Sequence, residues 1–449
     1  MSQLSEQVRQ QFDFRPYPQI PIEQEVTEES SLLFSHEWQT PHYLQTGRVP
    51  EPKTARILDA GCGTGYGTLA LATANPGAEV LGVDFSAASL EKARSRLDYH
   101  GHHQVELHCL DLMQLHELGI QFDYINCDDT LYLFDDPIAA LGQLQEVLKP
   151  GGILRVNVHS ALQREAVYRG QTLFHRWGLL EENPETPAVE TLQGVMGQLK
   201  GWVNLKQQTW KPEFAREEAT ADILMNYLFQ GDRGYTIPKV FEILEQAGLQ
   251  FLRMVNWQQW DLLALFNQPQ SLPPSILEQL RGMSVQQQLE WFELLHPVHR
   301  LLDFWCVNTH HPPADSVANW DAVTWANQWS QVQVWLHPQL CHDGFRDACL
   351  QSWHSQKPLL LNAYFDPGLN GVVTLDSRGA ISLFPLIKTS PQPLLNLIRR
   401  SIDLFPRHPE TLEPVQPELV LAQVKTLLVH LHHHGCVFLE HQPNEGRQR

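Results

Sequence analysis

The chain is 449 residues long, and its 32 basic and 51 acidic side chains give a formal net charge of −19. This length is too great for one ordinary hydrophobic core, so we expect two or three domains. The acidic balance disfavours a nucleic-acid partner, because counterion release from a phosphate backbone needs a basic protein face.

Short apolar runs alternate with helical patterns from residue 56 to residue 160. The runs predict strands over 56–59, 79–84, 105–111, 122–126 and 153–158. The patterns between them predict helices over 66–74, 87–99 and 137–148, the last ended by Lys149-Pro150-Gly151-Gly152. This alternation predicts a parallel, doubly wound α/β sheet, in which ligands bind at the carboxyl ends of the strands.

Residues 160–235 interrupt the alternation, with several tryptophans and no clean strand pattern. We interpret them as a helical lid insertion over the ligand edge of the sheet. A helix over 237–247 and a strand over 249–256 then resume the sheet. Residues 271–304 read as mostly helical, and the best linker is His310-His311-Pro312-Pro313.

The last part of the chain has a different pattern. Strands are predicted over 359–365 and 371–384, the second with a hairpin turn at Asp376-Ser377-Arg378-Gly379. Helices over 394–404 and 418–434 and a strand over 436–439 complete a small α+β module. The predicted domains are an N-terminal segment packing on the core (1–50), a ligand-binding domain (51–265), a helical connector (266–312) and an accessory domain (313–449).

The most informative stretch is the turn after the first strand, Asp59-Ala60-Gly61-Cys62-Gly63-Thr64-Gly65. Glycines there let the backbone approach a bound nucleotide closely, although the turn alone is a weak signal. Asp84 ends the second strand, where it can accept hydrogen bonds from both hydroxyls of a ribose. Asp111 ends the third strand, where it can accept from an adenine amine while Leu112 packs on the ring.

Two ligands fit such a pocket, a dinucleotide and S-adenosylmethionine. Asp59 would repel a pyrophosphate, whereas its carboxylate suits a ligand that carries an ammonium and a sulfonium. The pattern therefore favours S-adenosylmethionine over NAD.

On these motifs, residues 56–160 resemble the class I S-adenosylmethionine-dependent methyltransferases, with the segments 122–127 and 148–152 matching further parts of that family. The resemblance implies a seven-stranded Rossmann-like sheet. It also implies a set of cofactor-binding residues: Asp59, Gly61, Cys62, Gly63, Gly65, Asp84, Phe85, Asp111, Leu112 and Asn126. The N-terminal segment 12–18 resembles a proline–tyrosine segment that precedes some bacterial methyltransferase cores. In architecture alone, with its insertion and its extra C-terminal domain, the chain also resembles multidomain bacterial protein lysine methyltransferases.

The family's chemistry is an in-line displacement at the sulfonium methyl, in which a base can take the acceptor's proton. Our catalytic candidates are Asp128 and Tyr132, with Asp129 and His159 close by in the sequence. The segment after the fourth strand departs from the Asn/Asp-Pro-Pro-Tyr/Phe signature, so methylation of a nucleobase or of glutamine is disfavoured. The acceptor is expected to be a small molecule or a protein side chain.

Two other functions remain open from the sequence: a catalytically silent adenosyl-binding regulator and an NAD-dependent enzyme. The three acids at 59, 84 and 111 weigh against the silent regulator, because a decayed site could lose them.

Metal binding and membrane insertion find little support. The seven cysteines form no Cys-x-x-Cys pair, and His430 and His434 have no obvious third ligand, so we expect no metal. The N-terminus lacks the apolar core of a signal peptide, and no apolar run reaches membrane-spanning length. We therefore expect a cytoplasmic protein without a membrane segment.

Overall fold

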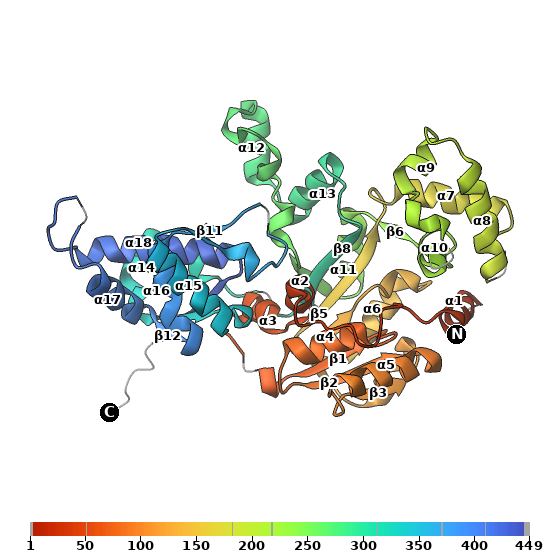
Figure 1. Ribbon diagram of the computed structural model, residues 1–449, viewed down its shortest axis with the longest axis horizontal. Helices are drawn as coiled ribbons and strands as arrows, with labels where there is room; N and C mark the ends of the chain where they lie inside the picture. Colours follow the sequence, from red (N-terminus) through yellow and green to blue (C-terminus); the bar gives the residue numbers. More distant parts are fainter. Residues whose placement is uncertain are drawn as a thin grey trace. The chain divides into compact units, whose positions relative to one another are not determined.

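The computed structural model describes residues 3–50, 52–181, 183–216, 219–311, 313–369, 371–408 and 410–443 (Figure 1). The chain forms two compact units. The first contains Met1–Val26, Lys53–Val255 and Trp260–His311, and the second contains Thr27–Pro52, Asn256–Gln259 and Pro312–Arg449. The predicted N-terminal segment 1–50 is thus divided between the two units, and most of the predicted connector 266–312 belongs to the first.

The first unit is built on a large α/β sheet, which confirms the predicted fold class. A path of seven strands runs in the order β3-β2-β1-β4-β5-β8-β7, and the short strand β6 pairs with β5. All pairings are parallel except those of β8, which runs antiparallel to both β5 and β7. The strands are β1 (Arg56–Ala60), β2 (Glu79–Asp84), β3 (Glu106–Cys109), β4 (Phe122–Cys127), β5 (Leu148–Ser160), β6 (Gly234–Tyr235), β7 (Leu249–Met254) and β8 (Leu301–Asn308).

The apolar run of β1 explains its central place in the sheet. Ile57, Leu58 and Ala60 have no exposed surface, as expected of a parallel strand that is covered on both faces. The helices that follow the strands are α4 (Tyr66–Ala74), α5 (Ala87–Tyr99), α6 (Pro137–Glu146) and α11 (Ile237–Gln246). Side chains cap two of these helices: Ser86 caps α5 by accepting from the amide of Ser89, and Asp136 caps α6 by accepting from the amides of Ile138 and Ala139.

The strand β8 corrects the prediction that residues 271–304 are mostly helical and that 266–312 form a helical connector. Helices α12 (Pro274–Gly282) and α13 (Val285–Leu295) are present, but β8 follows them and joins the sheet between β5 and β7. Phe304, Trp305 and Cys306 are all fully buried. Because both faces of this strand are covered, its sequence is apolar from Phe304 to Val307 and lacks the alternation that reveals a half-exposed strand.

The insertion between β5 and β6 is helical, as predicted for residues 160–235. It contains α7 (Glu165–Arg176), α8 (Thr186–Gln198), α9 (Asn204–Thr209) and α10 (Thr220–Asn226). Tyr227 packs its ring against Phe174, Trp210 and Phe214, so this group of helices has an aromatic core of its own. The first unit also contains α1 (Gln3–Phe14).

The second unit mixes helices with small sheets. An antiparallel sheet has the order β12-β9-β13, and β10 pairs with β11. Its strands are β9 (Val332–Leu336), β10 (Leu359–Leu360), β11 (Thr374–Leu375), β12 (Gln392–Pro393) and β13 (Val437–His441). Its helices are α2 (Ser30–His36), α3 (Gln39–Thr46), α14 (Ala322–Gln328), α15 (Asp343–Ser355), α16 (Ser377–Lys388), α17 (Leu394–Leu404) and α18 (Pro417–His433).

The hairpin predicted within 371–384 is wrong. Asp376 accepts a hydrogen bond from the amide of Gly379 at 2.6 Å and caps the start of α16. Aspartate, serine and glycine favour both turns and helix N-termini, so the same four residues fit either structure. The strand predicted over 359–365 is likewise reduced to β10 and a turn of 3-10 helix.

No helix in the described ranges combines the length and the apolar character that a membrane crossing requires.

Candidate active site

Glycines form the turn between β1 and α4 because the chain itself leaves no room for side chains there. Three of them have positive φ angles: Gly61 at 84°, Gly63 at 51° and Gly65 at 80°. A Cβ atom on Gly61 would lie 2.4 Å from the hydroxyl of Thr130, and one on Gly63 would lie 2.4 Å from the carbonyl of Tyr17. The turn therefore needs glycine for its backbone conformation and for its contacts within the protein.

Asp59, at the start of this turn, has a buried carboxylate with two side-chain partners. It accepts hydrogen bonds from the hydroxyl of Thr68 at 2.7 Å and from the amide of Asn126 at 2.8 Å. The register of β1 and β4 sets Asp59 opposite Asn126, which explains the second contact. Burial raises the pKa of Asp59 to about 6, so a cation placed beside this carboxylate would favour its ionised form.

Asp84, at the end of β2, ties the glycine turn to the next helix. Its carboxylate accepts from the amide of Gly63 at 2.9 Å and from the amide of Ser86 at 2.8 Å. Burial raises the pKa of Asp84. Each carboxylate oxygen has a further lone pair, so Asp84 retains the capacity to accept from ligand hydroxyls.

The other predicted cofactor residues lie along the same edge of the sheet. Asp111 accepts from the amide of Met113 and caps a short 3-10 helix that begins at Leu112. Leu112 and Cys62 are buried. The ring of Phe85 contacts the ring of Phe12. Phe12 lies shortly before Tyr17, whose carbonyl approaches the glycine turn.

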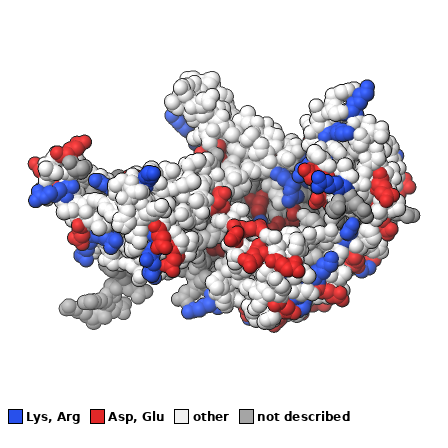
Figure 2. Space-filling view, viewed as in Figure 1, with Lys and Arg blue, Asp and Glu red and all other residues white. Residues whose placement is uncertain are grey.

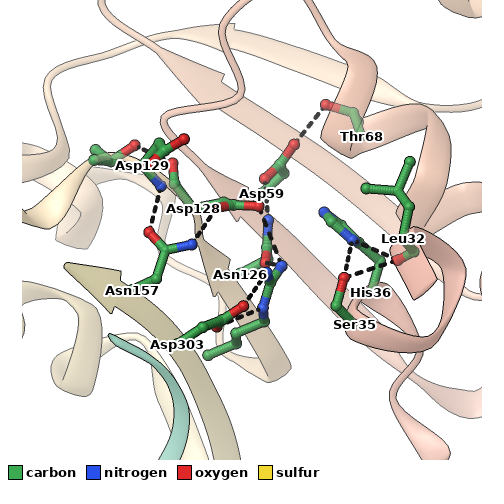
Figure 3. Close-up of polar contacts among 12 residues, drawn as sticks. Leu32, Ser35, His36, Asp59, Thr68, Asn126, Asp128, Asp129, Asn157 and Asp303 are labelled. Carbon is green, nitrogen blue, oxygen red and sulfur yellow. Dashed lines mark hydrogen bonds and ion pairs between the residues drawn. The ribbon is translucent and has the colours of Figure 1, made fainter. Parts of the chain in front are cut away.

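A chain of polar side chains runs from Asp59 along the strand ends (Figure 3). Asn126 accepts from Arg155 at 2.8 Å, and Arg155 forms a two-pronged ion pair with Asp303 of β8. Burial alone would lower the pKa of Arg155, but its two acidic partners, Asp128 and Asp303, outweigh burial and raise it. Asp128 also accepts from Asn157. The predicted catalytic residue Asp128, whose side chain is 32% exposed, is thus held by two buried partners, Arg155 and Asn157.

Beyond Asp128 lies a cavity of 280 Å³ at the carboxyl ends of β4 and β5. Its described lining comprises Phe12, Tyr17, Asp129, Tyr132, His159, Lys211, Met225, Asn226, Phe229 and Arg300. The predicted residue Tyr132 is in this set, whereas Asp128 is not. Asp129 takes its place, held at a φ of 47° by a hydrogen bond from its amide to Asn157 at 2.7 Å.

Aromatic rings and ionic groups meet at Tyr132. Its ring stacks on His159 with 4.0 Å between the centroids, and its hydroxyl donates to Asp129 at 3.3 Å. Burial raises the pKa of Tyr132 well above its ordinary value, so its hydroxyl keeps its proton. Arg300 reaches the same corner, 3.4 Å from Asp129.

The sequence allows the segment that contains Tyr17 either to pin the N-terminus onto the sheet or to line the acceptor pocket, and Tyr17 lines the cavity. Sequence reasoning did not anticipate Arg300 or Asp232 as members of this site. Arg300 precedes a strand that the sequence concealed. Asp232 contacts His159 at 2.7 Å across 73 residues of chain. No local pattern encodes such a pairing, because it depends on where the insertion returns to the sheet.

Comparison with known proteins places the site in a family. A family model described as a methyltransferase domain matches residues 52–218. An uncharacterised protein of Synechococcus sp. is 27% identical over 351 residues, which cover 77% of this chain and 78% of that protein. A trans-aconitate 2-methyltransferase of Deinococcus radiodurans is 38% identical over 110 residues, 24% of this chain and 40% of the relative.

A solved structure shares the fold. PKMT2 from Rickettsia typhi in complex with AdoHcy has a TM-score of 0.56 and 16% identity, with 91% of this chain and 76% of that chain covered. At 16% identity this structure shows a shared fold alone. The family match over residues 52–218 confirms the relationship that the glycine turn predicts: this segment of the chain is a methyltransferase domain.

Proposed function

We propose that this protein transfers a methyl group from S-adenosylmethionine to an acceptor that enters the cavity beside Tyr132 and His159. The observation that carries the proposal is the set of three carboxylates, Asp59, Asp84 and Asp111, at the ends of three neighbouring strands, next to a glycine turn and a separate cavity. When bound, S-adenosylmethionine supplies an electrophilic methyl group. The protein's own part is to bind, to orient and to exclude water.

The residues present fit this cofactor. Asp84 can accept from ribose hydroxyls, Asp111 can accept from an adenine amine beside Leu112, and Asp59 can face an ammonium. A pyrophosphate would meet the carboxylates of Asp59 and Asp84 and be repelled by their charge, so these two residues weigh against NAD.

The insertion supports a lid in this proposal. Four residues of the insertion line the cavity: Lys211, Met225, Asn226 and Phe229. Closure of such an insertion over the acceptor would exclude water from the methyl transfer.

The acceptor in this proposal is a small molecule or a protein side chain. On the face shown in Figure 2, acidic side chains gather over the part of the first unit that Figure 1 labels α4 and α5. Such a face supports an acceptor other than a nucleic acid, whose phosphates it would repel.

Two measurements test the proposal. Calorimetry should detect binding of S-adenosylmethionine and of its demethylated product, but not of NAD. Incubation of the protein with methyl-labelled S-adenosylmethionine and a fractionated cell extract should then place the label in the protein or the small-molecule fraction. Binding of NAD alone, or label in the nucleic-acid fraction, would overturn it.

A further inference from the structure

Two neighbouring side chains fix the neutral ring of His159 in one tautomer. It lies near the end of β5, with Nδ1 2.7 Å from a carboxylate oxygen of Asp232 and Nε2 2.9 Å from a guanidinium nitrogen of Arg300. A guanidinium can only donate, so Nε2 must present its lone pair. The proton of the neutral ring therefore resides on Nδ1 and points to Asp232.

Asp232 is built to hold this arrangement. Its side chain is fully buried and accepts from Arg164 at 3.0 Å and from Gln171 at 2.9 Å. Burial would raise the pKa of Asp232, but the hydrogen bond from His159 and the charge of Arg164 lower it. Asp232 is thus an anion fixed behind the imidazole, where it can stabilise a positive charge that forms on the ring.

We propose that His159, oriented by Asp232, takes up the proton that the acceptor loses on methylation, and that the acceptor group is a hydroxyl or a neutral amine. This inference rests on the proposed function. In the step, a lone pair of the acceptor oxygen or nitrogen forms the new bond to the methyl carbon, and the O–H or N–H bond breaks with its electron pair remaining on that atom. The carbon–sulfur bond breaks with its pair remaining on sulfur, and the proton moves to Nε2. A carboxylate acceptor would have no proton to lose and no use for this pair.

Arg300 occupies the position that the acceptor needs. Its side chain is 46% exposed, and its other contact in the cavity, with Asp129, is long at 3.4 Å. An acceptor hydroxyl or amine that displaces Arg300 from Nε2 would therefore break few contacts. Asp129 remains beside the cavity, with Tyr132 stacked on the imidazole.

Burial keeps His159 neutral before the reaction. It lowers the pKa of the imidazole, and together with the charge of Arg164 it outweighs the hydrogen bond and charge of Asp232 and the charge of Asp129, which raise that pKa. A neutral imidazole with its lone pair toward the cavity is the form that accepts a proton.

The first test examines the protein alone, without any acceptor. Long-range ¹H–¹⁵N spectra, assigned with the variant His159→Gln, should show His159 neutral at about pH 7 with its proton on Nδ1. In Asp232→Asn this tautomer preference should be lost. A charged imidazole at that pH, or a proton on Nε2, would overturn the inference.

The second test follows methyl transfer into the acceptor fraction of a cell extract. His159→Gln should lower the rate by roughly 100-fold or more while the Kd for S-adenosylmethionine changes less than about threefold. The matched control is His103→Gln, whose side chain is 72% exposed, and it should behave as the wild type. Asp232→Asn should lower the rate and alter its pH profile, which a purely structural role would not do.

The label distinguishes the acceptor classes. Methyl ethers and methylamines keep their label in mild alkali, whereas methyl esters release it, so alkali-labile label would overturn the inference. A His159→Gln rate within about threefold of the wild type would also overturn it. Failure of the wild type to bind S-adenosylmethionine would instead refute the proposed function, whatever the tautomer of His159.

Discussion

The main-chain carbonyl of Tyr17 lies where a side chain on Gly63 would begin, because a Cβ there would be 2.4 Å from the oxygen. Two hydrogen bonds fix this approach. The amide of Thr64 donates to Tyr17 at 3.1 Å, and the hydroxyl of Thr64 donates to the carbonyl of Pro18 at 2.7 Å. The N-terminal segment is therefore bound across the glycine turn, and any ligand held by the turn depends on that segment.

Gly63→Ala should separate the segment from the turn. The new methyl group meets a backbone oxygen that cannot move without breaking the Thr64 contacts, so we expect a loss of roughly 2–4 kcal/mol in the free energy of unfolding. Urea denaturation measures this loss, and limited proteolysis near Tyr17 should become faster.

The matched control for this variant is Gly101→Ala. Gly101 also has a positive φ, 79°, but nothing lies within 4 Å of its Cβ position. It should therefore show only the backbone strain of about 1–2 kcal/mol. Equal losses for the two variants would show that the contact with Tyr17 carries no cost.

The strands β1, β2, β4 and β5 could be predicted from the sequence because each contains an apolar run, and β3 because it follows the same alternation of strands and helices. The glycine turn and the acids Asp59, Asp84 and Asp111 follow those strands, so one edge of the site was also predictable. This works because the carboxyl ends of parallel strands meet at one edge of a sheet.

The acceptor side of the site could not be predicted in the same way. His159 takes its orientation from Asp232, which lies beyond the insertion, and from Arg300, which lies before β8. These contacts join segments that are distant in sequence and have no shared periodicity. The choice of Asp128 over Asp129 had a similar origin, since only the backbone geometry after β4 decides which carboxylate lines the cavity.

Asp84→Asn should weaken both the turn and cofactor binding. An asparagine keeps one acceptor oxygen, so one of the amides of Gly63 and Ser86 loses its partner, at a cost of about 1–3 kcal/mol in stability. The affinity for S-adenosylmethionine should fall by about 10- to 100-fold, because hydrogen bonds from ribose to a charged acceptor are lost. Calorimetry measures this affinity.

Asp123→Asn is the control for Asp84→Asn. Asp123 also accepts from a backbone amide, that of Arg56 at 2.8 Å, but it stands at the opposite ends of the strands. Its substitution should lower stability without changing the affinity. An unchanged affinity in Asp84→Asn would refute the ribose assignment.

Asp59 should make stability depend on pH between about 4 and 6. Its pKa in the folded protein, about 6, is above its ordinary value of 3.8, so the folded state binds more protons in this range. Stability due to the protonated form is complete below pH 4 and is lost as the pH rises through 6. The loss is about 3 kcal/mol for a shift of about two pKa units.

Asp59→Asn removes this titration. From pH 4 to pH 6 the free energy of unfolding of the wild type should therefore fall relative to that of Asp59→Asn. Urea denaturation across that range measures this difference. A difference that stays constant with pH would contradict the raised pKa. Binding of the cationic methyl donor favours the ionised carboxylate, so it should release protons at about pH 5.

Tyr43→Phe should destabilise the second unit at the last strand of its sheet. The hydroxyl of Tyr43 donates to the carbonyl of Leu439 at 3.0 Å and accepts from the amide of Leu439 at 3.1 Å. It thereby occupies backbone groups of β13, which ends the sheet order β12-β9-β13.

Without the hydroxyl of Tyr43, the buried amide of Leu439 loses its partner, at a cost of about 1–3 kcal/mol. Hydrogen exchange at the Leu439 amide should become faster by about 5- to 150-fold, the factor that corresponds to this free energy. Tyr364→Phe, a similar change in the same unit, should leave this amide protected. Unchanged exchange in Tyr43→Phe would mean that neighbouring groups, rather than this hydroxyl, protect the strand.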